Sequence, residues 1–214
     1  MSNTLLRLTA SLVLIFTATT AIAQDAANNE PKPAEPFVYA PTTEDITTGV
    51  PDAPVTLVEY ASLSCPHCAH FHNEVLAELR KKYIEPGKLR LVYRHFPLNA
   101  PALSAAVTVN CVEPNERAKY LKVLFATQDK WAFDTKFQDA ISGIVSVGGL
   151  TTERLSACRL DKSLEERILK IRQEAAQKGW VESTPTFFLN GVKYVGDRNV
   201  EEFSKAIDSL LTKK

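Results

Sequence analysis

Two cysteines, Cys65 and Cys68, are separated by only two residues, so they can close a small disulfide ring. They follow a strand-like run at residues 55–60 and stand at the start of a predicted helix. The unpaired N–H groups at a helix N-terminus favour the thiolate that forms when such a ring opens. The spacing therefore predicts thiol–disulfide exchange, with Cys65, which precedes the helix, as the more exposed nucleophile and Cys68 as its buried partner.

The other two cysteines, Cys111 and Cys158, lie in a region of helical periodicity. Four cysteines allow three pairings, and the short spacing of the first pair favours Cys65–Cys68 together with Cys111–Cys158. An even number of cysteines is typical of disulfide-bonded exported proteins, and we expect the second pair to be a structural disulfide. A second interpretation is that this pair also tunes the redox potential of Cys65–Cys68.

The N-terminal segment has the pattern of a secretory signal. Arg7 precedes an apolar stretch at residues 8–18, and Ala21-Ile22-Ala23 fits the small-residue cleavage pattern. The stretch is too short to span a bilayer, so we predict a signal peptide at residues 1–23, cleaved near Ala23, and export to the periplasm. The polar, proline-rich residues 24–36 are predicted to form a disordered tether.

The charge balance excludes some classes of partner. The chain carries 25 Lys and Arg against 25 Asp and Glu. This balance gives no electrostatic reason to bind nucleic acid or an anionic membrane surface. We therefore expect no nucleic-acid partner.

Hydrophobic periodicity places the Cys65–Cys68 pair inside a strand–helix–strand unit. Residues 55–61 predict a buried strand, 66–84 a helix and 89–95 a second strand, and such a unit makes its strands parallel. A loop is expected at residues 41–54. Helices are expected near residues 101–113, 116–130, 135–147, 151–159 and 161–178.

The C-terminal part returns to strand character. Residues 186–189 predict a strand, Asn190-Gly191 a hairpin turn and residues 192–195 the second arm. Asn199 can cap a terminal helix that runs to about Leu211. Together these elements predict an α/β fold, in which a mixed four-stranded sheet with flanking helices is interrupted by a helical insertion.

Three features together resemble the DsbA-like thiol oxidases of the thioredoxin superfamily. They are Cys65-Pro66-His67-Cys68, the segment Ser183-Thr184-Pro185-Thr186-Phe187, and the helical insertion between them. The resemblance implies a thioredoxin fold interrupted by an inserted α-helical domain, and no cofactor beyond the redox-active Cys65–Cys68 disulfide. The boundaries it implies are 37–97 for the first part, 98–179 for the insertion and 180–214 for the second part.

The resemblance also assigns roles to residues around the cysteines. Thr184 and Pro185 would form a cis peptide that presents the Thr184 backbone to an extended substrate peptide. Glu59 would be a buried acid that aids proton transfer at Cys68, and the alternative is a strand-edge side chain facing solvent. His67 would stabilise the Cys65 thiolate, and the alternative is an exposed residue without a role.

A metal site is the main competing use of these residues. Three of the four histidines lie with both cysteines in the window 65–72, a density that suggests zinc or copper. On a helix, however, His67, His70 and Cys68 do not all point one way, so we expect no metal site. Haem attachment is excluded because Ala69 stands where that motif needs His.

The leading prediction is an exported, monomeric thiol oxidase that donates its Cys65–Cys68 disulfide to reduced, unfolded, newly translocated proteins. The resemblance implies reoxidation by a membrane quinone reductase of the DsbB type. The first alternative is a disulfide isomerase or reductase, because Thr184 stands where the oxidases often carry Val. The second is a metal-binding or holdase module that uses the fold without turnover.

Overall fold

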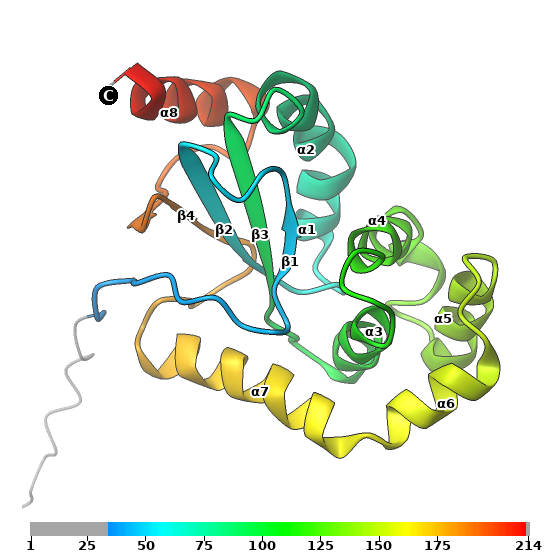
Figure 1. Cartoon of the computed structure of the whole chain (residues 1–214). Coiled ribbons are helices and arrows are strands. Elements are labelled where there is room, and N and C mark those ends of the chain that lie inside the picture. The colour runs from blue at the N-terminus through cyan, green and yellow to red at the C-terminus, as the bar shows by residue number, and fades with distance from the viewer. Residues whose placement is uncertain (1–33, 213–214) are drawn as a thin grey trace, which may run out of the picture. The chain divides into compact units, whose positions relative to one another are not determined.

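The computed structural model describes residues 34–212. The predicted signal peptide and most of the predicted tether lie outside the described residues. A five-stranded sheet in the order β1-β3-β2-β4-β5 forms the centre of the fold (Figure 1). The strands are β1 Ile46–Thr48, β2 Val55–Ala61, β3 Leu89–His95, β4 Thr186–Leu189 and β5 Val192–Lys193.

Strand β2 lies in the middle of the sheet, where most of its side chains are apolar and all but that of Thr56 are buried. It pairs in parallel with β3, as the strand–helix–strand pattern predicts, and antiparallel with β4. Glu59 is the one acidic residue of β2, and its backbone lies opposite Tyr93 of β3 and Phe187 of β4. Because its strand is paired on both sides, the Glu59 carboxylate lies in the buried interior of the protein.

The expectation of a loop throughout residues 41–54, and of a four-stranded sheet, was wrong. Residues Ile46–Thr48 form β1, which pairs antiparallel with β3 at the edge of the sheet. A three-residue edge strand is too short to show a two-residue period in the sequence. The second hairpin arm is also shorter than expected, because it ends at Lys193 and leaves Val195 89% exposed.

The hairpin turn itself matches its sequence. Asn190 and Gly191 have φ angles of 45° and 86°, which are the positive values that a tight primed turn requires. Helix α8, Val200–Thr212, follows, and Asn199 Oδ1 accepts a hydrogen bond from Glu202 N as the predicted cap. The predicted hairpin and terminal helix are thus both confirmed.

One helical run extends from Pro66 to Ile84, the range that the periodicity predicts. Pro66 occupies its first position, where a missing N–H costs little. The run alternates between α-helical and π-helical turns, which the sequence did not predict. Its segments are α1 Pro66–His70, η1 Phe71–Val75, α2 Leu76–Leu79 and η2 Arg80–Ile84. Its apolar side chains share one core cluster with β2, β3, β4 and α8.

The helical insertion lies between β3 and β4 along the chain (Figure 1). The predicted helix at 116–130 is broken at Thr127, whose backbone is not helical, and a short 3-10 turn follows α4. Trp131 after this turn is fully buried, in a core cluster that the insertion shares with Cys65 and Cys68. The elements are α3 Ala100–Asn110, α4 Arg117–Ala126, η3 Gln128–Lys130, α5 Phe137–Ser146, α6 Thr152–Leu160 and α7 Lys162–Gln177.

The first described residues already contact the folded chain. The Glu35 backbone N–H donates to Lys178 O, and Trp180 Nε1 donates to Glu35 O at 2.8 Å. Phe37 stacks on Phe188 with ring centroids 3.9 Å apart. The prediction of a disordered tether up to residue 36 was therefore wrong at its C-terminal end, because two backbone groups of Glu35 already have partners after α7.

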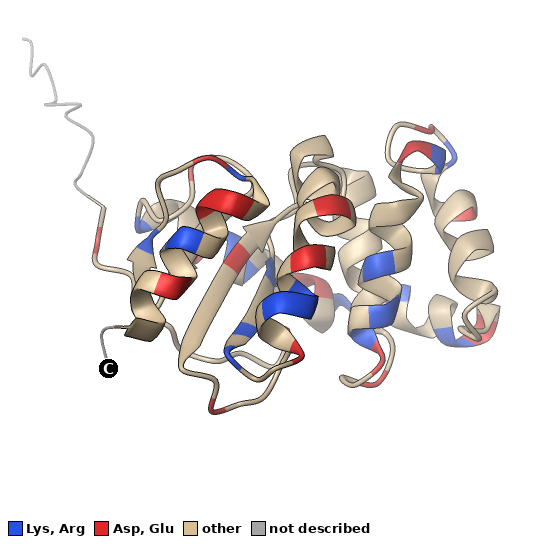
Figure 2. Ribbon diagram, turned by 90° about the horizontal axis from the view of Figure 1, so that it is seen from above, with Lys and Arg blue, Asp and Glu red and all other residues tan. Residues whose placement is uncertain are grey.

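The described surface carries both signs of charge on the same helices (Figure 2). No helix within residues 34–212 has the length and apolar character needed to cross a membrane. The mixed distribution agrees with the even balance of acidic and basic residues in the sequence.

Candidate active site

Cys65 occupies the N-cap position of α1, where its backbone is still extended, with φ −83° and ψ 121°. Its carbonyl oxygen accepts the first helical hydrogen bonds, from Cys68 N and Ala69 N at 3.1 Å each. The side chain of Cys65 is 7% exposed and that of Cys68 is 0% exposed. Both are free thiols, so the structure shows the reduced form of the pair.

The two thiols differ strongly in acidity. The pKa of Cys65 is lowered to about 5, first by a hydrogen bond from the Cys68 thiol and against the opposing effect of burial. A hydrogen bond with Thr184 and the backbone N–H groups of Cys68 and His67 lower it further. The pKa of Cys68 is raised by burial, by its hydrogen bond to Cys65 and by the charge of Glu59. Cys65 is therefore the thiolate at neutral pH, and Cys68 remains protonated.

The loop before β4 faces this thiolate. The peptide bond between Thr184 and Pro185 is cis. Cys65 Sγ lies 3.3 Å from the carbonyl oxygen of Thr184, a contact to which the sulfur can donate only while it carries its proton. The structure thus brings Thr184 and Pro185 to Cys65, although 119 residues separate Cys65 from Thr184 in the sequence.

Glu59 is fully buried, with 0% of its surface exposed, so the strand-edge alternative was wrong. Its Oε2 lies 2.8 Å from His72 Nε2. Its Oε1 is buried and has no hydrogen-bond partner within the described part of the chain. The His72 ring is held by stacking on Phe125, with ring centroids 4.2 Å apart. A role for Glu59 in proton transfer stays a prediction.

His67 lies at the surface, between the two cysteines. Its backbone N–H lowers the pKa of Cys65, whereas its ring forms no hydrogen bond with any residue between 34 and 212. Any electrostatic help from the imidazole therefore stays a prediction. The main-chain contribution depends on the helix start and not on the histidine side chain.

The other two histidines of the window 65–72 have separate partners. His70 is exposed and its Nδ1 lies 3.1 Å from Glu74 Oε1, while His72 is turned inward to Glu59. Within residues 34–212, no three His, Cys, Asp or Glu side chains gather in a group that could hold a metal ion.

Gln128 is a residue of the site that the sequence did not suggest. Its side-chain amide is buried, and Nε2 donates to Leu63 O at 2.7 Å and to Cys65 O at 3.0 Å. The helical insertion therefore holds the loop that carries Cys65. The only sequence signal was a polar residue at the end of a helix, which is common in any protein.

Cys111 and Cys158 form a disulfide in the structure. It joins the C-terminal end of α3 to α6, with the two Cα atoms 5.7 Å apart. The pairing that the cysteine spacing favours is present, and both cysteines belong to the insertion. Whether the bond affects the potential of Cys65 and Cys68 stays a prediction.

Known proteins resemble the chain in both sequence and fold. A family model described as Thioredoxin matches residues 41–209. A Rickettsia felis relative named as a protein-disulfide oxidoreductase is 30% identical over 88% of this chain and 68% of its own length. A Rickettsia conorii relative with the same type of name is 31% identical over 78% of this chain. The chain spans 60% of the length of that second relative.

Solved structures share the fold over most of the chain. Wolbachia pipientis alpha-DsbA1 is 30% identical, with a TM-score of 0.75 over 81% of this chain and 94% of the other. Bacillus subtilis BdbD is 19% identical, with a TM-score of 0.70 over 84% of this chain and 97% of the other. The second likeness concerns the fold alone.

Proposed function

We propose that this chain, which belongs to the thioredoxin family and has relatives named protein-disulfide oxidoreductases, is a thiol oxidase that donates a Cys65–Cys68 disulfide to reduced proteins. The observation that carries this proposal is the placement of the two thiols, with Cys65 at the N-cap of α1 and Cys68 fully buried in its first turn, which makes their acidities unequal. The Cys65 pKa is lowered to about 5 and the Cys68 pKa is raised. A stabilised thiolate favours the reduced enzyme, and a disulfide whose reduced form is stabilised is a strong oxidant.

The reaction proceeds in two exchanges. A substrate thiolate attacks Cys65 Sγ of the oxidised enzyme, the Cys65–Cys68 bond breaks, and Cys68 leaves and takes up a proton. A second thiolate of the same substrate then attacks the substrate sulfur of the mixed disulfide. Cys65 leaves as a thiolate, the substrate gains a disulfide, and the enzyme holds the two electrons.

The loop at Thr184 supports a role in substrate positioning. Its carbonyl oxygen lies 3.3 Å from Cys65 Sγ, so a peptide chain aligned with this backbone would bring its own cysteine to the reacting sulfur. Main-chain pairing of this kind is independent of side chains and suits unfolded substrates of varied sequence. The clients that we propose are reduced, newly translocated proteins in the periplasm.

Turnover requires a partner that removes the two electrons. We propose a membrane quinone reductase of the DsbB type, whose quinone takes up two electrons and two protons while Cys65 and Cys68 close again. The enzyme is proposed to work as a monomer. This reoxidation restores the disulfide for the next substrate.

The test is the equilibrium potential of the Cys65–Cys68 pair against a glutathione series, read by thiol labelling. We expect a value nearer about −120 mV, as for DsbA, than about −270 mV, as for thioredoxin. Oxidation of a reduced, unfolded protein should be fast, and a Cys65→Ser variant should not support it. A thioredoxin-like potential would overturn the oxidase proposal.

Disulfide isomerisation is the second candidate, because Thr184 faces Cys65 where oxidases of the family often carry Val. The two activities separate on their substrates. An oxidase accelerates disulfide formation in a reduced protein, whereas an isomerase accelerates the recovery of a protein with scrambled disulfides. Faster recovery of the scrambled protein than oxidation of the reduced one would favour the isomerase.

A further inference from the structure

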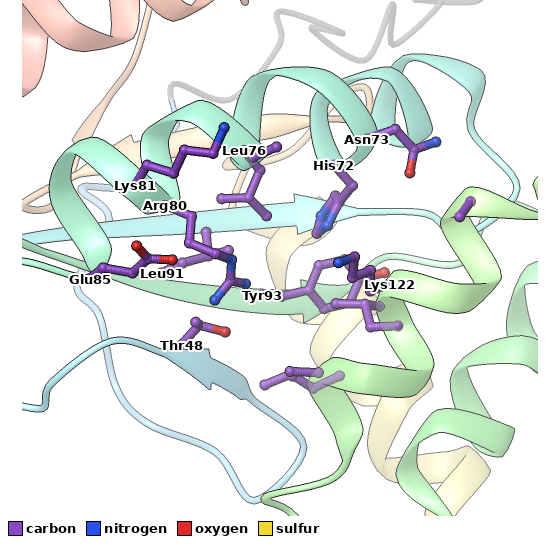
Figure 3. Close-up of a pocket in the computed structure, with 15 residues that line it drawn as sticks. Thr48, His72, Asn73, Leu76, Arg80, Lys81, Glu85, Leu91, Tyr93 and Lys122 are labelled. Atoms are coloured by element: carbon purple, nitrogen blue, oxygen red, sulfur yellow. The ribbon is translucent and has the colours of Figure 1, made fainter. Parts of the chain in front are cut away.

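A cleft of about 530 Å³ lies beside the helical run that starts at Pro66 (Figure 3). Leu76, Leu91 and Tyr93 contribute apolar surface to it, and Arg80 and Lys122 bring positive charge from two different helices. His72 points from its helix toward this space, where Tyr93 and Lys122 also lie (Figure 3). The cleft is therefore a place where solvent reaches a histidine that is otherwise enclosed.

The other side of the His72 ring leads to the active-site cysteines. His72 Nε2 lies 2.8 Å from Glu59 Oε2, and the two side chains are 5% and 0% exposed. The charge of Glu59 in turn raises the pKa of Cys68. A line of ionisable groups thus runs from the cleft through His72 and Glu59 to the inner cysteine.

Cys68 needs such a line because it has no exposed surface of its own. Each time the disulfide opens, Cys68 must gain a proton, and each time it closes, Cys68 must lose one. Glu59 is equally enclosed, so it cannot exchange that proton with solvent directly. Its neighbour His72 lines the cleft, and histidine is the side chain that most readily exchanges protons near neutral pH.

We propose that His72 carries protons between the cleft and Glu59, and in this way supplies and removes the proton of Cys68 during disulfide exchange. His72 acts through Glu59 and is therefore a positioning residue of the reaction. When the disulfide opens, Glu59 gives a proton to the Cys68 sulfur and regains one from His72, which the cleft reprotonates. Closure runs the same transfers in reverse. The inference rests on the proposed thiol–disulfide exchange.

The surroundings make His72, and not Tyr93, the side chain suited to pass a proton to Glu59. The Tyr93 hydroxyl donates to Ala61 O at 3.3 Å, and burial raises its pKa well above the usual value, so it keeps its proton. Stacking on Phe125 fixes the His72 ring. The ionisable side chains that face the ring or line the cleft with it are Glu59 from β2, Tyr93 from β3, Lys122 from α4, and Arg80, Lys81 and Glu85 from its own helical run.

The first experiment compares His72→Gln with the wild type. Glutamine can still donate to Glu59 but cannot take up a proton, so it keeps the contact and removes the relay. The readout is the rate at which dithiothreitol reduces the oxidised enzyme and oxidised glutathione closes it again, from acid to alkaline pH. We expect both rates to fall about tenfold or more and to lose one inflection in their pH profiles.

The matched control is His70→Gln, since His70 is exposed and its Nδ1 pairs with Glu74 on the same helical run. It should keep the wild-type rates and pH profile. An unchanged pH profile in His72→Gln, with a melting temperature like that of the wild type, would overturn the relay. Small thiols report on exchange itself, so this outcome is separate from a failure to oxidise protein clients.

A double variant tests whether His72 acts through Glu59. If the two form one path, adding His72→Gln to Glu59→Gln should slow the exchange no further, because residues that act as a unit are not additive. If the rate losses of the two single variants multiply in the double variant, His72 and Glu59 act independently and the proposed proton path is overturned. A measurement without variants uses the wild type: the NMR titration of the His72 ring should differ between the oxidised and reduced enzyme, and identical titrations would contradict the proposal.

Discussion

Gln128 Nε2 donates a hydrogen bond to Cys65 O at 3.0 Å, and this contact joins the helical insertion to the N-cap residue of the active-site helix. The same nitrogen also donates to Leu63 O at 2.7 Å. A residue 63 positions away in the sequence therefore helps to hold the backbone that presents the reactive sulfur. The insertion in this way contributes a residue to the active site.

This contact predicts that Gln128→Leu lowers stability and slows thiol exchange. The apolar side chain removes the buried donor of Leu63 O, which costs about 1–3 kcal/mol, and leaves Cys65 O with only its helical donors, Cys68 N and Ala69 N. Denaturant unfolding measures the loss, and labelling of Cys65 at fixed pH measures the effect on reactivity. Gln173→Leu is the control, because Gln173 is exposed on α7 and should change neither quantity. Equal behaviour of the two variants would contradict the positioning role of Gln128.

The lowered pKa of Cys65 predicts a particular pH dependence of stability in the reduced enzyme. Its folded-state pKa of about 5 lies below the ordinary value for an unfolded cysteine, about 8.5, so the unfolded chain holds this proton over a wider range. The stabilisation is therefore fully present above about pH 8.5 and is lost as the pH falls through about 5.

Thermal melting of the reduced protein at several pH values checks this. The melting temperature of the wild type, relative to that of reduced Cys65→Ser, should rise as the pH increases from about 5 to about 8.5. The ultraviolet absorbance of the thiolate should show a midpoint near 5 that the serine variant lacks. A pH-independent difference between the two proteins would speak against a buried thiolate at Cys65.

Two substitutions at His67 separate its backbone from its ring. His67→Ala keeps the N–H that lowers the pKa of Cys65, so the thiolate midpoint should stay close to that of the wild type. His67→Pro removes this N–H in the first helical turn, where proline is tolerated, and should raise the midpoint. Thiolate absorbance against pH measures both. If His67→Ala raised the midpoint as far as His67→Pro does, the imidazole would be the stabilising group.

The disulfide between Cys111 and Cys158 predicts a loss of stability without a change in redox potential. Replacing both cysteines by serine should lower the free energy of unfolding by about 2–5 kcal/mol, as is usual for a native disulfide. The potential of Cys65–Cys68 should stay the same, because the second bond links only α3 and α6 of the insertion. A shifted potential in the serine variant would show that the second disulfide tunes the first.

The sequence by itself determined the chemistry and the local structure of this protein. The spacing of Cys65 and Cys68 at a helix start predicted an unequal thiol pair, because a helix N-terminus stabilises a neighbouring thiolate whatever the rest of the fold does. Strands 55–61 and 89–95 and the terminal hairpin were predictable, because their patterns are local and long enough to recognise.

Tertiary structure decided which distant groups meet at the cysteines. Gln128 contacts Cys65 only because α4 breaks at Thr127, and His72 pairs with Glu59 only because its helix packs against the central strand. Strand β1 is equally dependent on its neighbour, since three residues carry no periodic signal. Such contacts depend on packing between segments far apart in the chain, so the residue pattern within one segment cannot predict them.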